Sequence, residues 1–379
     1  MSVSKKNLLG IHKWLGLVAG LFVLLMGLSG SLLVFDDEID HYLNRDVIDL
    51  SATDGTVNID AAYRSVQHKY PNWSVRITHI PEEADRSIQA QVRRPHDQRR
   101  ILYVHPSSGT ILRDLDSNET FSYWMLNFHY NLHSGFWGEI LLFLAGFCFL
   151  GSLITGFWFY RKSIWRVMTF KIRPRFRSWQ SGSSELHRFV GVWALLMNFL
   201  MALTGIILML IVVGTNTMHL LKGNADPIPN LPPVTISIDN LLNKAQTDMP
   251  GFVPSYIEMP ETAEDQITIY GHMNTDWPIH YEFSNHIKYG PQTGTETSHF
   301  LIRNNHWSYD ILSVAYPLHF GDWDGLLIKI IYCLAGLAPP LLSITGFIIW
   351  RNRWKKRTRI QQSHDVKNQS IKNKPELKK

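Results

Sequence analysis

The stretch "GIHKWLGLVAGLFVLLMGLSGSLLVF", residues 10–35, decides the fold because it is apolar over enough residues to cross a lipid bilayer. A helix needs about 20 apolar residues to span the hydrocarbon core. The run is longer than the apolar part of a secretory signal peptide, and no small-residue cleavage site follows it. Similar runs cover residues 137–160, 186–213 and 325–350. The sequence therefore predicts a membrane α-helical bundle of four transmembrane helices.

The third apolar segment repeats the pattern of the first. It is "ELHRFVGVWALLMNFLMALTGIILML", residues 185–210, and it places His187 on His12 and Arg188 on Lys13. A histidine in a membrane span is costly and usually marks function. The same histidine at the start of two matched segments is therefore a candidate for a shared site.

The second and fourth segments also match each other. "NLHSGFWGEILLFLAGF" (131–147) resembles "PLHFGDWDGLLIKIIYCLAG" (317–336), which places His133 on His319. Four residues are inserted in the second copy before "ITGF" recurs, and this stretch holds Pro339-Pro340, which should kink the fourth helix. Both halves therefore read as one duplicated unit, a parallel repeat with an axis along the membrane normal.

The basic residues indicate the orientation in the membrane. They gather in the loop between helices two and three and after helix four, and the chain carries a formal net charge of +5. Cytoplasmic loops are enriched in Lys and Arg, so both termini are expected in the cytoplasm and the two long loops in the periplasm of a bacterium. Membrane topology explains this charge, and no basic face of a soluble module predicts nucleic-acid binding. The residues concerned are Lys5, Lys6, Lys13, Arg161, Lys162, Arg166, Lys171, Arg173, Arg175, Arg177, Arg351, Arg353, Lys355, Lys356, Arg357 and Arg359.

Each long loop has the pattern of a small α+β domain. An amphipathic helix is expected from the apolar spacing near residues 59–70 and again near 238–249. Alternating strands follow, and then the turns "HPSSGT" (105–110) and "GPQTGT" (290–295), in which Gly109 and Gly294 can supply a positive φ. The sequence predicts two exported domains with the same fold.

These features together resemble the PepSY-associated transmembrane protein family. The resemblance is carried by "IHKWLGLVAGLFVLLMGLSG", the two "LH.G.W" motifs, the two "ITGF" motifs and the "HPSSGT" turn, and it covers nearly the whole chain. It implies an inner-membrane protein of iron homeostasis and, for some members, a two-haem reductase that releases iron from ferric siderophores. The expected order is transmembrane helices at 1–36, 131–162, 185–214 and 317–351, PepSY-like domains at 37–130 and 215–316, a basic cytoplasmic loop at 163–184 and a basic tail at 352–379.

The matched histidines suggest two b-type haem sites. A neutral imidazole from each side is the ligation of a six-coordinate haem, so His12 with His187 would hold an inner haem and His133 with His319 an outer one. His129 lies four residues before His133 and could replace it, contact a propionate, or be surface. Lys13 and Arg188 could pair with propionates, although anchoring at the cytoplasmic face explains them better.

The leading hypothesis is a haem-dependent membrane reductase that passes electrons across the membrane to a periplasmic ferric siderophore. The chain has no dinucleotide-binding G-x-G-x-x-G between a strand and a helix, so a quinol, a reduced flavin or a cytosolic reductase is expected as the donor. One rival is a non-enzymatic PepSY protein that inhibits peptidases or binds a partner. Another is an electron-transfer subunit for a different periplasmic acceptor.

Overall fold

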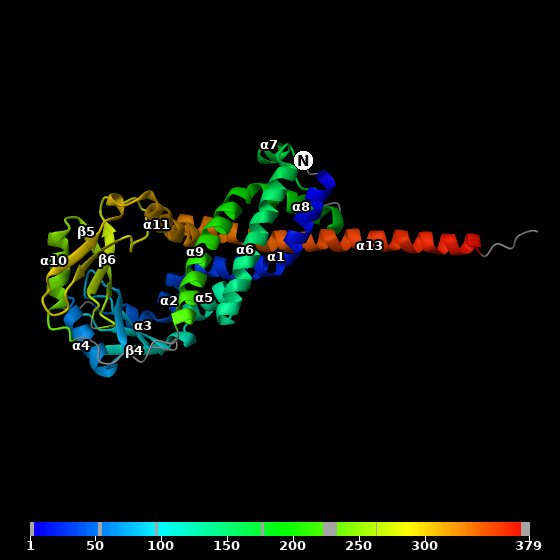
Figure 1. The fold of residues 1–379 in the computed structure, drawn as a ribbon. Coiled ribbons are helices and arrows are strands. Elements are labelled where there is room, and N and C mark those ends of the chain that lie inside the picture. The colour runs from blue at the N-terminus through cyan, green and yellow to red at the C-terminus, as the bar shows by residue number, and fades with distance from the viewer. Residues whose placement is uncertain are drawn as a thin grey trace, which may run out of the picture. The chain divides into compact units, whose positions relative to one another are not determined.

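The computed structural model describes residues 4–51, 55–94, 98–175, 178–222, 233–262 and 264–372. They fall into two compact units, whose chain course Figure 1 shows. The helical unit comprises Met1–Ser31, Ile140–Ile206 and Cys333–Lys379. The sheet unit comprises Leu32–Glu139 and Ile207–Tyr332.

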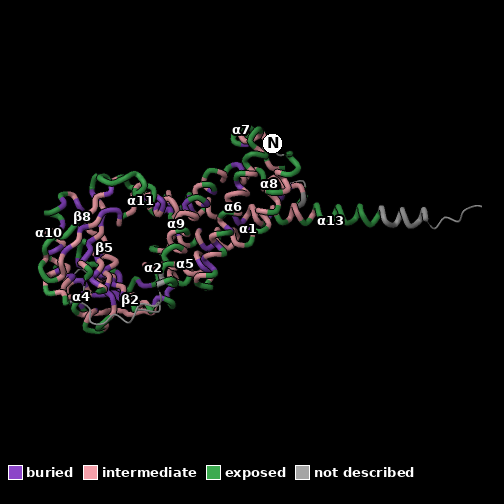
Figure 2. Tube along the Cα trace, in the orientation of Figure 1, coloured by how far each residue is buried: buried purple, intermediate pink, exposed green. Residues whose placement is uncertain are grey.

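Four helices of the described chain are long and apolar enough to cross a membrane. In three of them only 17% of the most apolar 18-residue window is buried inside the protein. Figure 2 shows the contrast with the sheet, where the buried residues concentrate. An apolar surface this exposed requires lipid around it, so the chain is a multi-pass membrane protein. The helices are α1 (Lys5–Leu33), α6 (Gly135–Tyr160), α9 (Leu195–Lys222), which follows α8 (Trp179–Trp193), and α12 (Gly325–Gly336) continued by α13 (Ala338–Lys372).

Two of the four expected spans are interrupted. The fourth is interrupted at Leu337, two residues before Pro339 and Pro340, in the stretch where a kink was predicted. Both prolines lie in the first turn of α13, where their missing N–H groups cost little. The third breaks at Ala194, which the sequence did not predict. α13 continues far beyond residue 350, because residues 351–372 contain no proline or glycine; residues 373–379 of the expected tail lie outside the described residues.

The sheet unit contains one antiparallel sheet with the strand order β4-β3-β2-β1-β5-β6-β7-β8. Two separate domains were expected, but β1 pairs with β5 and joins the strands of both loops into a single sheet. This pairing removes one unpaired edge from each set of four strands. The strands are β1 (Ser74–His79), β2 (Ile88–Arg94), β3 (Gln98–Val104), β4 (Ile111–Asp116), β5 (Phe252–Glu258), β6 (Ile267–Met273), β7 (Asn285–Tyr289) and β8 (Glu296–Phe300).

One hydrophobic core includes residues from both loops. The helices α4 (Ile59–Lys69) and α10 (Ile238–Asp248) bury the faces that the apolar spacing predicted, including Ala62, Val66 and Ala245. They pack in one cluster with strand residues such as Ile77 and Ile257, a pair at the β1–β5 junction.

The N-termini of α4 and α10 cap each other. Asp239 of α10 accepts hydrogen bonds from the backbone N–H groups of Ile59 and Asp60, both at 3.0 Å. Asp60 of α4 accepts in turn from the Ile238 N–H at 2.7 Å and the Ser237 hydroxyl at 2.5 Å. Each carboxylate thus satisfies donors that a helix N-terminus leaves unpaired.

The two predicted turns have the same geometry. Gly109 and Gly294 have φ of 69° and 62°, and each donates its N–H to the carbonyl four residues earlier, at His105 and Gly290. At Gly109 a side chain is excluded twice, because an added Cβ would lie 2.5 Å from the Ala61 carbonyl oxygen.

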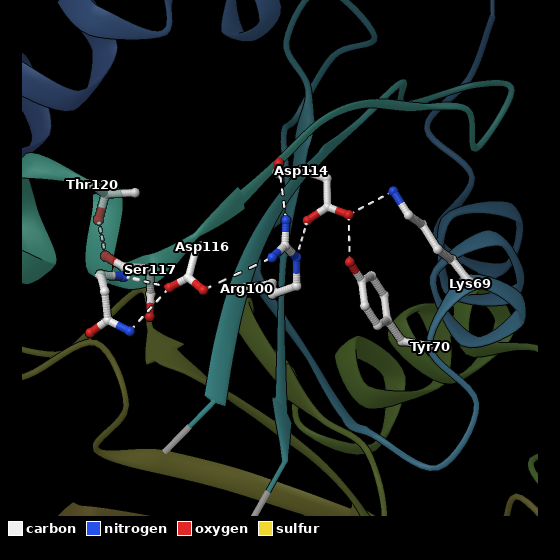
Figure 3. Close-up of polar contacts among 8 residues, drawn as sticks. Lys69, Tyr70, Arg100, Asp114, Asp116, Ser117 and Thr120 are labelled. Carbon is white, nitrogen blue, oxygen red and sulfur yellow. Dashed lines mark hydrogen bonds and ion pairs between the residues drawn. The ribbon is translucent and has the colours of Figure 1, made fainter. Parts of the chain in front are cut away.

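A polar network links the edge strand β4 to the helix α5 (Phe121–Asn131) (Figure 3). Asp114 accepts from the Tyr70 hydroxyl at 2.5 Å and from Arg100 Nε at 2.6 Å, and pairs with Lys69 at 2.6 Å. Thr120, which caps α5, is tied to β4 through the short helix Ser117–Glu119. This network fixes the start of α5.

The remaining helices are α2 (Asp36–Leu43), α3 (Arg45–Ile48), α7 (Ile164–Met168), α11 (Trp307–Phe320) and a short 3-10 helix at Ile302–Asn304.

Candidate haem site

His12 contacts the helix that carries the first "ITGF" motif. Its Nδ1 lies 2.9 Å from the Ser152 carbonyl oxygen and 3.3 Å from the Thr155 hydroxyl, both on α6. A carbonyl oxygen can only accept, so Nδ1 carries the hydrogen. The other ring nitrogen, Nε2, is then the unprotonated atom that can bind a metal.

His187 has the corresponding contact with the second motif. Its Nδ1 lies 2.9 Å from the Thr345 hydroxyl of α13. That hydroxyl donates its own hydrogen to the Leu341 carbonyl at 2.7 Å, one turn earlier in the helix. It therefore accepts from Nδ1, and Nε2 of His187 is again the free atom.

The glycine of each motif gives the imidazole ring its space. A Cβ added at Gly156 would lie 3.2 Å from Cε1 of His12, and one added at Gly346 would lie 3.3 Å from Cε1 of His187. The threonine and the glycine of "ITG" thus act on one ring together. The sequence pattern placed Thr155, Gly156, Thr345 and Gly346 in the repeat but assigned them no role. The available signal was that Thr and Gly are adjacent in both copies of the motif.

The rings of His12 and His187 lie close to each other in the helical unit, edge to face. Their centres lie 6.3 Å apart, with an interplanar angle of 77°. An iron held by two imidazole nitrogens at about 2 Å each needs ring centres about 6 Å apart, because each ring nitrogen lies about 1 Å from its ring centre. His12 and His187, each with an unprotonated Nε2, would therefore be the residues able to hold a haem in the helical unit.

A second histidine pair with the same separation lies in the sheet unit. The rings of His129, near the end of α5, and His319, near the end of α11, also have centres 6.3 Å apart, at 57°. The sequence favoured His133 as the partner of His319 and kept His129 as the alternative. The structure brings His129 to His319.

His133 lies elsewhere because the chain leaves α5 before reaching it. Leu132 and His133 both have left-handed backbone angles, with φ of 55° and 52°, so His129 and His133 do not share a helix. The His133 side chain is exposed, and its ring lies 4.8 Å from the ring of Trp124 and 6.1 Å from that of Phe128.

The sequence contained a signal for His129. The two "ITGF" motifs are 190 positions apart. Gly135 and Gly325, where α6 and α12 begin, are also 190 apart, and so are His129 and His319. The two "LH.G.W" motifs are 186 positions apart, so aligning them places the four-residue insertion inside helix four. The structure favours an insertion before that helix begins.

The two basic candidates lie beside the histidines but have other contacts. Lys13 Nζ lies 4.6 Å from the ring centre of Trp14. Arg188 is exposed, donates from Nε to the Ser184 carbonyl at 3.1 Å, and lines a cavity of about 100 Å³ with Arg173 and Phe189. Neither contact tests a role toward a propionate.

An acidic cluster in the sheet unit surrounds Lys329 of α12. Its Nζ lies 2.9 Å from Glu38 and 3.2 Å from Asp322. Nearby, burial raises the pKa of Asp36 to about 6, with a smaller lowering effect of a hydrogen bond from Ser122. Within the described ranges no group of three or more His, Cys, Asp or Glu side chains is arranged to hold a free metal ion.

Together the helices and the sheet define a multi-pass membrane protein with a β-sheet domain and two facing histidine pairs. The family model of the PepSY-associated TM region matches residues 9–353. The chain therefore belongs to this family, as the sequence motifs indicated. No curated protein matches the chain.

Proposed function

We propose that the protein is a haem-dependent oxidoreductase of the bacterial cytoplasmic membrane that reduces ferric siderophore iron in the periplasm. The observation that carries this proposal is the equal 6.3 Å separation of two histidine pairs, His12–His187 and His129–His319. Each pair takes one histidine from each half of the chain. Haem bound to both pairs would supply one-electron transfer.

The hydrogen bonds of His12 and His187 leave one ring nitrogen of each histidine available to a metal. Hydrogen bonds to α6 and α13 retain the Nδ1 hydrogens of His12 and His187, which leaves the two Nε2 atoms as ligands. Bonds of this kind orient most metal-binding histidines and raise their basicity.

We further propose that the two halves are a duplicated unit related by a two-fold axis along the membrane normal. This proposal is supported by the symmetric strand order, by the reciprocal capping of α4 and α10, and by the spacing of 190 residues that His129 and His319 share with the two "ITGF" motifs. The Lys and Arg distribution supports cytoplasmic termini and a periplasmic sheet unit. The donor would then act from the cytoplasmic side or from the membrane, as a quinol, a reduced flavin or a cytosolic reductase.

The test is the haem content of protein purified from haem-replete cells. We expect two b-type haems per chain, with the optical spectrum of a low-spin, six-coordinate iron. Rapid reoxidation of the reduced protein by ferric siderophores, and slow reoxidation by other periplasmic oxidants, would support the acceptor. Colourless protein would reject the proposal and favour a PepSY protein that inhibits peptidases or binds a partner. Haem without reoxidation by siderophores would favour an electron-transfer subunit for another acceptor.

A further inference from the structure

We infer that Thr155 and Thr345 are positioning residues for the two histidines of the helical unit. Their hydroxyls hold the imidazole rings of His12 and His187 so that each Nε2 faces the shared site. The inference rests on the proposed function, because a metal bound at Nε2 gives this orientation its purpose.

The first step is the direction of the hydrogen bonds. Thr155 donates its hydroxyl hydrogen to the Gly151 carbonyl at 2.8 Å, and Thr345 donates to the Leu341 carbonyl at 2.7 Å. A hydroxyl has one hydrogen and two lone pairs. Once that hydrogen points along its own helix, the oxygen offers only lone pairs to the histidine. Each Nδ1 must then be a donor, which selects the tautomer with a bare Nε2.

The second step is the space that the neighbouring glycine leaves for the ring. The residue after each threonine is a glycine, and a Cβ at either glycine would lie 3.2–3.3 Å from the Cε1 of the histidine. Contacts this short are tighter than most that real Cβ atoms make. Glycine therefore leaves room for the ring beside the threonine, where a larger residue would crowd Cε1. The hydrogen bond at Nδ1 orients the ring in this space, and rotation about the last side-chain bond would break it.

The third step is a difference between the two sites. At His12 the Ser152 carbonyl is the nearer acceptor, at 2.9 Å, and the Thr155 hydroxyl is at 3.3 Å. At His187 the Thr345 hydroxyl is itself at 2.9 Å, and the Leu342 backbone also accepts from the ring. Hydrogen bonds weaken with distance over this range. Thr345 should therefore contribute more to its histidine than Thr155 does.

The test compares T345V and T155V with the conservative variants T345S and T155S in the full-length haem-loaded protein. Valine keeps the shape of threonine and removes the acceptor, whereas serine keeps the acceptor. T217V is the matched control, because the Thr217 hydroxyl makes the same bond to the carbonyl four residues earlier in its own helix. The readouts are the rate of haem transfer to an apo-globin, the midpoint potential of each haem and the low-spin electron paramagnetic resonance signal.

We expect T345V to weaken retention of one haem by about 10–100-fold, as loss of such supporting hydrogen bonds typically does. The potential of that haem should rise, because a less basic imidazole stabilises ferric iron less, and its resonance signal should change as the ring turns. T155V should have the same effects to a smaller degree. Serine variants and T217V should resemble the parent protein.

Unchanged retention, potential and resonance signal in T345V would overturn the inference while leaving the haem proposal intact. Equal loss in T345V and T345S would also overturn it, because packing and not the hydroxyl would then be responsible. If the parent protein itself binds no haem, the proposed function fails first and the two failures remain distinct.

Discussion

The two histidine pairs have the same ring separation, but the chain positions them in different ways. His12 and His187 lie within α1 and α8 and contact a neighbouring helix through the same Thr-Gly motif. His129 and His319 lie near the ends of α5 and α11, each of which stops at a residue in the left-handed conformation. The first pair depends on helix-to-helix contacts, and the second depends on where two helices end.

The helix ends also differ between the halves. α11 is capped by Gly321 with φ of 75°, which glycine adopts freely, whereas α5 is capped by Leu132 with φ of 55°. A left-handed conformation costs a non-glycine residue about 1–2 kcal/mol. The folded chain has this unfavourable backbone conformation at Leu132, which lies between His129 and His133. Equal sequence letters around the two histidines therefore do not guarantee equal positions.

The largest expected effect distinguishes His129 from His133 as the partner of His319. H129A should remove one of two low-spin haems, because it removes an iron ligand, and H319A should remove the same one. H133A is the matched control and should keep both, since His133 is exposed and contacts Trp124. Haem content and the reduced optical spectrum provide the measurement. Loss of a haem in H133A with retention in H129A would reverse the assignment.

A second variant tests the contact that only the first pair has. G156A adds a Cβ at 3.2 Å from Cε1 of His12 and should displace the ring. Overpacking of this kind costs about 1–3 kcal/mol, so we expect one haem to be lost more readily while the His129–His319 haem is retained. Haem transfer to an apo-globin should show two phases, one for each haem, and only one of them should become faster in G156A. If neither rate increases, the His12 ring has room to move.

A third variant probes the stability of the sheet unit through Asp36. Burial raises the pKa of this carboxyl to about 6, above the value of about 4 expected in the unfolded chain. The folded state therefore loses stability as pH rises from about 4 to about 6, and the loss is complete above that range. D36N should increase the free energy of unfolding at pH 7–8 by up to about 2 kcal/mol and should therefore raise the melting temperature there. Near pH 4 it should have little effect on either. A gain that is the same at both pH values would contradict titration of Asp36.

The smallest expected effect concerns the reciprocal caps. D239A removes the acceptor for the N–H groups of Ile59 and Asp60, and should destabilise the sheet unit by about 1 kcal/mol. D60A should have a similar effect, because it leaves the Ile238 N–H and the Ser237 hydroxyl without their carboxylate. Chemical unfolding of the detergent-solubilised protein would measure both. The double variant should lose more than the two single losses combined, because each single change also relieves the repulsion between the two carboxylates. Burial and this repulsion from Asp60 both raise the pKa of Asp239.

Parts of the fold could be predicted because they depend on neighbouring residues. The buried faces of α4 and α10 follow from apolar spacing, and the turns at Gly109 and Gly294 from glycine at the required position. The break before Pro339 follows from the missing N–H of proline. In each case a window of a few residues contains the whole cause.

The joining of the two loops could not be predicted in this way. β1 and β5 pair through residues about 180 positions apart, such as Ile77 and Ile257. Nothing in the sequence of either strand alone shows whether its edge remains exposed or pairs with another strand. The reciprocal capping by Asp60 and Asp239 is hidden for the same reason, since each aspartate serves the other helix.

By itself the sequence determined the four membrane spans, the break in the fourth, and the match of His12 with His187, because composition and spacing along one helix carry that information. Only the tertiary structure decided that His129 faces His319 and that Thr155 and Thr345 hold the other pair. The physical reason is that a left-handed residue at Leu132 redirects the chain within one peptide unit. A hydrogen bond from one helix to another likewise depends on atoms that come together only when the chain has folded.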